Sequence, residues 1–238
     1  MNRPTLSVVM PVYNEAAYVA ECLHRVFERG HPDQVILVDD GSTDGSWEAV
    51  QSSPYAARVT LLRHRHNHGK GAAIRTALPH VRCDVVIIQD GDLEYDPADY
   101  DRLLEVMDRT GSPVVYGSRH LANNPHSTFG FYLGGRALSL LANLLFDLEL
   151  TDVPTCYKLL RSDLLRRIPL RADRFEFCAE VTGILGRMGV AIPEVGIRYR
   201  PRSRTEGKKI TPRDGLRAMA TLCRLRLTSM QALRAQDD

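Results

Sequence analysis

A short apolar run that ends in two carboxylates constrains the fold of this chain most. Residues 85–88 (Val-Val-Ile-Ile) are followed at once by Gln-Asp-Gly-Asp, which places carboxylates at Asp90 and Asp92. A bounded run rich in Val and Ile predicts a buried strand of a mostly parallel sheet. Open α/β sheets bind ligands beyond the carboxyl ends of their strands, so we expect these acids at a binding edge.

The spacing of the two acids indicates a cation. Two carboxylates so close together repel each other unless a positive charge neutralises them. Hard oxygen ligands suit Mg²⁺ or Mn²⁺, which usually keep waters and are completed by substrate phosphates. The alternative is a strand that runs into an acidic, solvated turn, continued by Glu94 and Asp96.

Alternating strands and helices fill the rest of the chain. Apolar strands are predicted at 6–10, 35–38, 59–62, 85–88 and 114–116, with amphipathic helices between them. Beyond about residue 121 the pattern predicts one apolar helix, strands near 156–160 and 192–199, a helix near 179–188, and a basic C-terminal helix. Repeated βα units predict a parallel sheet with right-handed crossovers. The expected class is α/β, with a single Rossmann-like, mostly parallel sheet flanked by helices.

Composition and charge indicate the compartment and the binding partners of the chain. The 238 residues carry a net charge of +2 and contain five cysteines without a CxxC pair, which indicates free thiols in a reducing, cytoplasmic compartment. No apolar run approaches the ~20 residues that span a bilayer. Residues 198–217 hold eight basic side chains and two acidic ones, which indicates contact with phosphates, unless this is a solvated face.

Acids gather at three predicted strand ends. They are Glu15, the pair Asp39 and Asp40, and the pair Asp90 and Asp92. Such acids can accept hydrogen bonds from the N–H groups of a base and from ribose hydroxyls. The chain has no GxGxxG after its first strand and no GxxxxGK[ST], so it supports neither a dinucleotide fold nor a P-loop. Gly69-Lys70-Gly71 opens a helix, and Lys70 could reach a phosphate.

Five motifs together carry a family resemblance. They are Pro11-Val-Tyr-Asn-Glu15, Asp39-Asp-Gly-Ser-Thr-Asp-Gly45, Asn67-His-Gly-Lys-Gly71, Gln89-Asp-Gly-Asp-Leu-Glu-Tyr-Asp96 and Gly117-Ser-Arg119. In order and spacing they resemble glycosyltransferase family 2, and more closely its dolichyl-phosphate mannosyltransferase-like branch, from about Leu6 to Gly215. The resemblance implies an A-type glycosyltransferase (GT-A) fold, a UDP- or GDP-sugar donor, an inverting mechanism and a divalent metal, Mg²⁺ or Mn²⁺.

The resemblance also implies roles for single residues. The residues expected to hold the nucleotide sugar are Pro11, Tyr13, Glu15, Asp39, Asp40, Lys70, Asp90, Gly91, Asp92, Arg202 and Lys208. Asp90 and Asp92, with Glu94, are the expected metal ligands, and Arg202 and Lys208 match a pair on a loop that closes over the nucleotide. Arg119 matches an arginine that faces the donor phosphates or the acceptor. The group expected to act in catalysis is Asp92, Arg119, Arg202 and Lys208.

Two features concern the acceptor. Residues 129–150 are apolar on nearly all sides around Arg136, so they could receive a lipid chain while Arg136 and Arg119 meet its phosphate; an ordinary core helix is the alternative. A polyprenyl phosphate is already ionised and needs no general base. A hydroxyl acceptor (a natural product, small glycoside or protein) would need one, and Asp152 and Glu180 are the candidates.

The organisation expected is one glycosyltransferase domain over residues 1–238. Residues 1–120 form the nucleotide-sugar half, 121–215 the acceptor half, and 216–238 a basic helix that could lie on an anionic membrane, on the domain, or on a second subunit in a homodimer. We expect a cytoplasmic protein with peripheral contact at the inner face of the membrane. A nucleotidyltransferase would carry a basic, glycine-rich loop after its first strand, which 11–15 is not. No nucleic-acid partner is expected, since such binding leaves the acid clusters unexplained.

Overall fold

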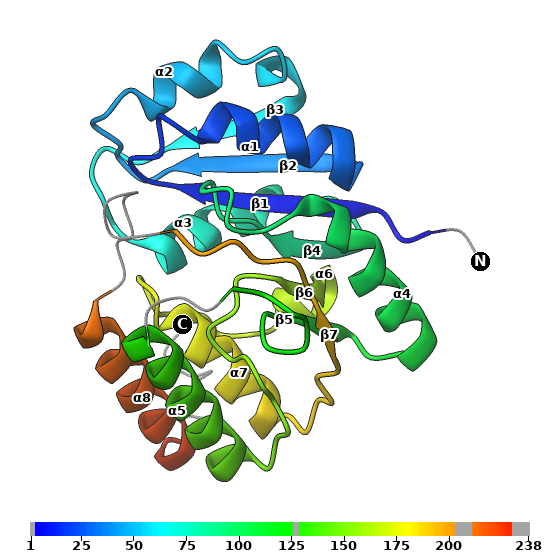
Figure 1. Cartoon of the computed structure of the whole chain (residues 1–238), viewed down its shortest axis with the longest axis vertical. Coiled ribbons are helices and arrows are strands. Elements are labelled where there is room, and N and C mark those ends of the chain that lie inside the picture. Colours follow the sequence, from blue (N-terminus) through cyan, green and yellow to red (C-terminus); the bar gives the residue numbers. More distant parts are fainter. Residues whose placement is uncertain (1–2, 126–128, 203–210, 230–238) are drawn as a thin grey trace.

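A single seven-stranded mixed sheet organises the computed structural model, which describes residues 3–125, 129–202 and 211–229 (Figure 1). The strand order is β3-β2-β1-β4-β6-β5-β7, and β6 runs antiparallel to both of its neighbours. The strands are β1 (Leu6–Val12), β2 (Gln34–Asp39), β3 (Val59–Arg63), β4 (Val85–Ile88), β5 (Val114–Ser118), β6 (Lys158–Arg161) and β7 (Glu194–Gly196). The predicted mostly parallel sheet is confirmed, with one antiparallel strand in its middle.

Helices flank this sheet, as expected. They are α1 (Val19–Arg25), α2 (Ser46–Gln51), α3 (Lys70–Ala77), α4 (Tyr100–Thr110), α5 (Phe129–Phe146), α6 (Ser162–Leu165), α7 (Phe177–Arg187) and α8 (Pro212–Leu227). Within the described residues, none is long and apolar enough to cross a membrane.

The C-terminal helix was expected over 216–238, and its bounds differ. It begins at Pro212, because Thr211 and Asp214 form a capping box there and proline suits the first turn. It ends at Leu227, where Thr228 turns to an extended conformation. Residues 230–238 lie outside the described part of the chain.

The apolar runs explain why the sheet forms. Every residue of β4 is buried, and β1 and β2 are buried along nearly their whole length, as strands covered on both faces must be. In the parallel part of the sheet, Val12 of β1 lies opposite Asp39 of β2, and Val9 lies opposite Ile88 of β4. The segments that follow β1, β2 and β4 therefore leave the sheet at one edge, where the predicted acids lie.

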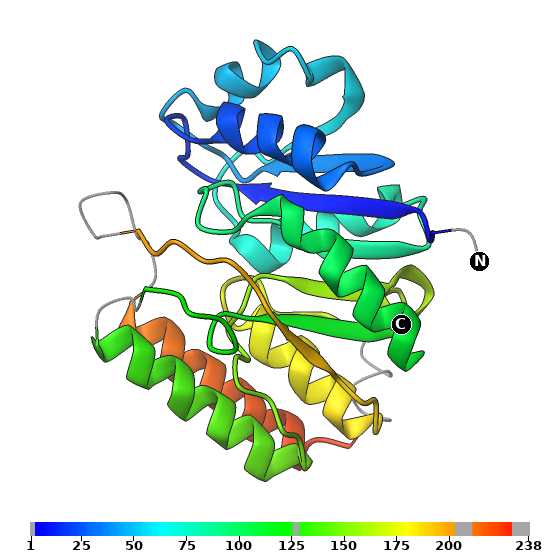
Figure 2. The same cartoon turned by 45° about the vertical axis from the view of Figure 1, so that its right-hand side comes forward.

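A layer of three helices covers the part of the sheet near β5 and β7 (Figures 1 and 2). Helix α7 is innermost, and α5 and α8 lie side by side outside it. Two glycines of α7 allow this close packing. A β-carbon on Gly183 would come within 2.8 Å of Leu225 Cδ1, and one on Gly186 within 2.7 Å of Phe146 Cβ. The layer leaves the outer faces of α5 and α8 uncovered by other described elements.

Candidate functional site

Arg202 ties together the acids at the carboxyl edge of the sheet. Its guanidinium donates to both carboxylate oxygens of Glu15, at 2.8 and 3.1 Å, and to Asp92 Oδ2 at 3.0 Å. Its backbone N–H donates to Glu94 Oε1 at 2.6 Å. The side chain of Arg202 is only 11% exposed, and its guanidinium carbon lies 5.1 Å from the centre of the Tyr18 ring. Segments almost 190 residues apart in sequence thus meet at one point.

The charge of Asp92 is unfavourable in this surrounding. Burial, and then the like charges of Asp90 and Glu94, raise the pKa of Asp92 to about 7, and Arg202 offsets only part of this. A cation would relieve the repulsion, and carboxylate oxygens are the ligands that Mg²⁺ and Mn²⁺ prefer. The chemistry of Asp90 and Asp92 therefore fits the divalent metal that the sequence predicts.

The predicted metal set of Asp90, Asp92 and Glu94 is not assembled as three ligands. Among the residues that the structure describes, no three His, Cys, Asp or Glu side chains gather as a metal-binding group. The reason is the partners of Glu94, whose carboxylate accepts from the hydroxyl of Tyr199 at 3.1 Å and from the backbone of Arg202. Glu94 holds the segment after β7 against the site, and the metal roles of all three acids stay predictions.

Lys70 reaches the same acid cluster from the first residue of α3. Its Nζ lies 2.5 Å from Asp90 Oδ1 and 3.5 Å from Cys156 Sγ. Although burial disfavours its charge, Asp90 raises the pKa of Lys70, so the ammonium stays charged. Lys70 and Arg202 are therefore two cations that contact Asp90 and Asp92, respectively.

Asp40 is fully occupied by the loop before α3. Its carboxylate accepts four hydrogen bonds, from the His64 ring, the Asn67 amide and the backbone N–H groups of His68 and Gly69, all between 2.7 and 2.9 Å. Two carboxylate oxygens offer about four acceptor sites. Asp40 thus fixes the loop that presents Lys70, which leaves its predicted contact with a nucleotide untested.

The remaining residues predicted to hold the nucleotide lie nearby. Asp39 ends β2 and pairs with Arg63, whose Nε is 3.0 Å from Oδ2. Pro11 is half-buried within β1, and Tyr13 is half-buried just after it. Gly91 packs on β1, since a β-carbon there would lie 3.2 Å from Val12 Cγ2. Lys208 lies outside the described residues, so its role stays a prediction.

Arg119, after β5, forms a buried ion pair. Its Nε and Nη2 each donate to Asp152 at 2.7 Å, and its backbone N–H donates to the same carboxylate at 2.9 Å. Burial alone would raise the pKa of Asp152, but Arg119 lowers it below its ordinary value. Glu194 in turn accepts from the backbone N–H groups of Thr151 and Asp152. The pair thus orders the segment at 151–152.

Both candidate general bases are engaged in structural contacts. Asp152 is fully buried and engaged by Arg119. Glu180, on α7, is also buried, and its Oε2 accepts from the backbone N–H groups of Arg171 and Ala172 at 3.0 and 2.9 Å. Burial raises the pKa of Glu180. Both carboxylates therefore act as structural anchors.

Arg136 of α5 approaches the segment that Arg119 orders. Its Nη1 donates to the carbonyl of Thr151 at 3.2 Å, and its side chain is exposed. The two arginines predicted to meet an acceptor phosphate thus flank residues 151–152: Arg136 is exposed, and the guanidinium of Arg119 is in an ion pair.

Lys158 is a residue whose role the sequence did not reveal. It is fully buried on β6, where its Nζ donates to the carbonyls of Val153 and Thr155 at 2.8 and 3.0 Å and lies 3.9 Å from the centre of the Tyr116 ring. Burial lowers the pKa of Lys158. The sequence predicts only a strand near 156–160 at this place, whereas the contacts of Lys158 show that it shapes the turn after Asp152.

The glycines around Lys70 are required by close packing. A β-carbon on Gly71 would lie 2.1 Å from the carbonyl oxygen of Ala172, a backbone atom. We expect Gly71→Ala to lower the free energy of unfolding by about 1–3 kcal/mol, as overpacking does, measured by urea denaturation. Gly215→Ala is the matched control, because nothing lies within 4 Å of its β-carbon on α8. Equal stability of the two variants would contradict the packing argument.

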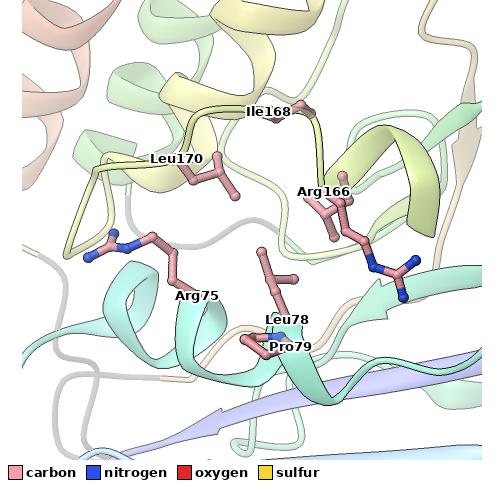
Figure 3. Close-up of a pocket in the computed structure, with 7 residues that line it drawn as sticks. Arg75, Leu78, Pro79, Arg166, Ile168 and Leu170 are labelled. Atoms are coloured by element: carbon pink, nitrogen blue, oxygen red, sulfur yellow. The ribbon is translucent and has the colours of Figure 1, made fainter. Parts of the chain in front are cut away.

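A separate pocket lies between the end of α3 and residues 165–170 (Figure 3). It measures about 320 Å³ and has an apolar floor, to which Leu78, Ile168 and Leu170 contribute. Arg75 and Arg166 border it, but their guanidinium groups donate to the carbonyls of Ala172 and Val81. None of the predicted site residues lines this pocket.

Comparisons with known proteins agree with the family that the motifs indicate. The model of the glycosyl transferase family 2 matches residues 7–168. A dolichol-phosphate mannosyltransferase from Pyrococcus furiosus is 26% identical over 214 residues, which are 86% of this chain and 60% of that protein. An undecaprenyl-phosphate 4-deoxy-4-formamido-L-arabinose transferase from Edwardsiella ictaluri is 36% identical over 116 residues, 46% of this chain and 35% of that protein. The chain thus spans less than two thirds of these two relatives.

Solved structures show the same fold. Glucosyl-3-phosphoglycerate synthase from Mycobacterium tuberculosis, in complex with Mn²⁺, UDP and phosphoglyceric acid, superposes with a TM-score of 0.72 at 21% identity. The match covers 95% of this chain and 80% of that one. This likeness confirms the expected GT-A fold.

Proposed function

The chain belongs to glycosyl transferase family 2, and from this membership we propose that it moves a sugar from a UDP- or GDP-sugar to a polyprenyl phosphate, with inversion at the anomeric carbon. The observation that carries the proposal is the cluster of Asp90 and Asp92 at the carboxyl edge of the sheet, contacted by Lys70 and Arg202. Such a cluster suits a diphosphate with a divalent cation. The relatives named for dolichol-phosphate and undecaprenyl-phosphate chemistry support the acceptor.

Electrostatics is the proposed source of catalysis. As the sugar–phosphate bond breaks, negative charge grows on the departing nucleoside diphosphate. Bound Mg²⁺ or Mn²⁺, held by Asp90 and Asp92, would stabilise that charge. Arg202 and Lys70 are cations in a site that water reaches poorly, where such charges act more strongly than in solution. Lys208 is proposed to add a further cation.

The acceptor needs no proton removed. An oxygen of the polyprenyl phosphate forms the new bond to the anomeric carbon while the bond to the diphosphate oxygen breaks on the opposite side. The structural engagement of Asp152 and Glu180 supports this acceptor over a hydroxyl, which would need one of them as a base. We further propose that the enzyme is cytoplasmic and meets its acceptor at the inner face of the membrane.

The test is a panel of UDP- and GDP-sugars with Mn²⁺, with donor hydrolysis measured first and polyprenyl phosphate then added. The expected result is one preferred donor and transfer to the lipid phosphate. Transfer to a water-soluble alcohol, with polyprenyl phosphate inert, would replace the proposed acceptor by a soluble hydroxyl.

Arg136 gives a sharper test of the acceptor. Arg136→Ala should reduce transfer to polyprenyl phosphate by ~10- to 10²-fold, the value of a charge-assisted hydrogen bond, while background donor hydrolysis changes little. Arg109→Ala, an exposed arginine on α4, is the control. A parallel loss of hydrolysis and transfer in Arg136→Ala would show that Arg136 serves the donor or the fold.

A further inference from the structure

The outer faces of α5 and α8 carry the same apolar pattern. On α5, the exposed stripe is Leu133, Ala137, Leu140 and Leu144; on α8, it is Leu216, Ala220, Cys223 and Leu227. Both stripes follow the spacing i, i+4, i+7, i+11, which aligns residues on one face of a helix. Leu144 is 75% exposed and Leu227 is 87% exposed. Five of the six large apolar side chains that are exposed in the described residues lie on these two helices.

Core packing does not explain these stripes. The opposite face of each helix is the buried one, formed on α8 by Ala218, Thr221, Leu222 and Leu225. That face meets α7, where Leu225 packs against Gly183. Figure 2 shows α5 and α8 side by side over α7. Because each stripe lies opposite the buried face of its helix, we infer that the two stripes belong to one surface on the outside of the helical layer.

The charge on the two helices is mostly positive, and the exposed acids nearest to the α5 stripe, Asp147 and Glu149, follow the end of that helix. The two helices contain five arginines and one acid, Asp214. Asp214 is engaged in the helix cap, where its Oδ2 accepts from the backbone and hydroxyl of Thr211 at 2.8 Å. On α8, the exposed Arg213, Arg217 and Arg224 flank the leucine stripe on one side. An apolar stripe edged by arginines is complementary to an anionic lipid surface.

The same surface is continuous with the proposed acceptor site. Arg136 lies on the rim of the α5 stripe and contacts Thr151, next to the Asp152 that binds Arg119. A lipid whose chain stays in the membrane would therefore bring its phosphate to the end of this surface that adjoins the site.

We propose that the outer face of the α5–α8 pair docks the enzyme on an anionic membrane, with the leucine stripes entering the headgroup region and the arginines meeting lipid phosphates. The proposal deepens the proposed function and rests on it for the lipid acceptor. The docking itself can be measured without donor or acceptor.

Vesicle binding tests the docking on the full chain. The probe is vesicles of phosphatidylcholine with or without phosphatidylglycerol, free of polyprenyl phosphate. We expect binding only with phosphatidylglycerol, and Arg217→Glu/Arg224→Glu should weaken it by about 10²-fold, since each basic residue near such a surface contributes measurably. Arg109→Glu/Arg167→Glu makes the same charge change on exposed residues of α4 and of the turn after α6, and it should bind as the wild type does.

Cys223 provides a direct readout of the surface. It is exposed in the middle of the α8 stripe, whereas Cys22, Cys156 and Cys178 are buried. In a Cys83→Ser background, an environment-sensitive fluorophore on Cys223 should shift to the blue when anionic vesicles are added. Leu140→Gln/Leu144→Gln should weaken vesicle binding at an unchanged melting temperature, because these leucines are exposed.

The outcomes separate docking from chemistry. Arg217→Glu/Arg224→Glu should keep the wild-type rate with a short polyprenyl phosphate that dissolves without vesicles. Vesicle binding without any transfer to polyprenyl phosphate would refute the proposed acceptor and still support the docking surface. Equal vesicle binding by Arg217→Glu/Arg224→Glu and its control would overturn the docking. So would a wild-type dimer that Leu140→Gln/Leu144→Gln dissociates in sedimentation, because the face would then belong to a second copy.

Discussion

Replacing Asp92 by asparagine should reduce the rate of sugar transfer by ~10²-fold or more, because the loss of one charged group from a preorganised site typically lowers the rate by this factor. The change removes a charge and almost no volume, so the fold should persist. Thermal unfolding gives a readout besides activity: Mn²⁺ should raise the melting temperature of the wild type and not that of Asp92→Asn. Asp108→Asn, the same change on an exposed residue of α4, is the control. Full activity of Asp92→Asn in excess chelator would refute both the need for a metal and the role of Asp92 as its ligand.

The same substitution should not weaken the metal-free protein at neutral pH. Asp92 has an ordinary pKa of 3.8 and a folded pKa of about 7, so the folded state binds its proton more tightly than the unfolded state does. The stability from this group is thus fully present below about pH 4 and is lost as the pH rises through about 7. In chelator, the stability of Asp92→Asn relative to wild type should rise over that range in urea denaturation. A constant difference would mean that Asp92 titrates normally.

Arg119→Ala should be the most destabilising single change at this site. It leaves Asp152, which is fully buried, without the guanidinium that binds both of its oxygens. Removing one partner of a buried ion pair lowers the free energy of unfolding by about 3–5 kcal/mol. Urea denaturation at pH 7 measures this loss. Arg119→Ala/Asp152→Asn should recover part of it, because the neutral amide removes the unpaired charge.

The pH dependence identifies the cause of that loss. Arg119 lowers the pKa of Asp152 in the wild type, so the stability from this carboxylate is present above its ordinary pKa of 3.8 and is lost as the pH falls through the lower folded value. In Arg119→Ala the unpaired Asp152 gains a proton readily. The difference between wild type and variant should therefore shrink from pH 7 toward acid pH. A difference that does not change with pH would point to lost packing of Arg119 on Tyr199.

The positions of the acids were predictable because parallel strands share an edge. Once β1, β2 and β4 were identified as buried parallel strands, Glu15, Asp39 and Asp92 had to leave the sheet on one side. The meeting of Arg202 with Asp92 and Glu15 could not come from strand patterns. The family resemblance placed Arg202 on a loop over the nucleotide but did not predict its contacts with these acids, from which 110 and 187 residues separate it.

Other contacts depend on pairings that local sequence does not encode. Arg119 meets Asp152 because β5 lies beside β6, and the short run of β6 does not reveal that it runs antiparallel. The sequence also does not reveal which acceptor sites of a carboxylate are already used by other parts of the protein. The sequence predicts Asp40 as a nucleotide ligand and does not show that the loop at 64–69 already uses its acceptor sites. It likewise predicts Glu94 as a metal ligand and does not show its contacts with Tyr199 and Arg202; both roles stay predictions.

The place of β6 has a consequence for how the chain folds during synthesis. Strands β1 to β4 pair with one another, so this part of the sheet can form as soon as residue 88 has left the ribosome. The partners of β5 in the sheet are β6 and β7, which follow it by about 40 and 75 residues. At about 5–20 residues per second, β5 and the open edge of β4 wait at least about two seconds for β6. A nascent chain that pauses between residues 118 and 158 therefore presents the unpaired strand β5 and the open edge of β4 at once, and it is this intermediate that a chaperone would have to shield.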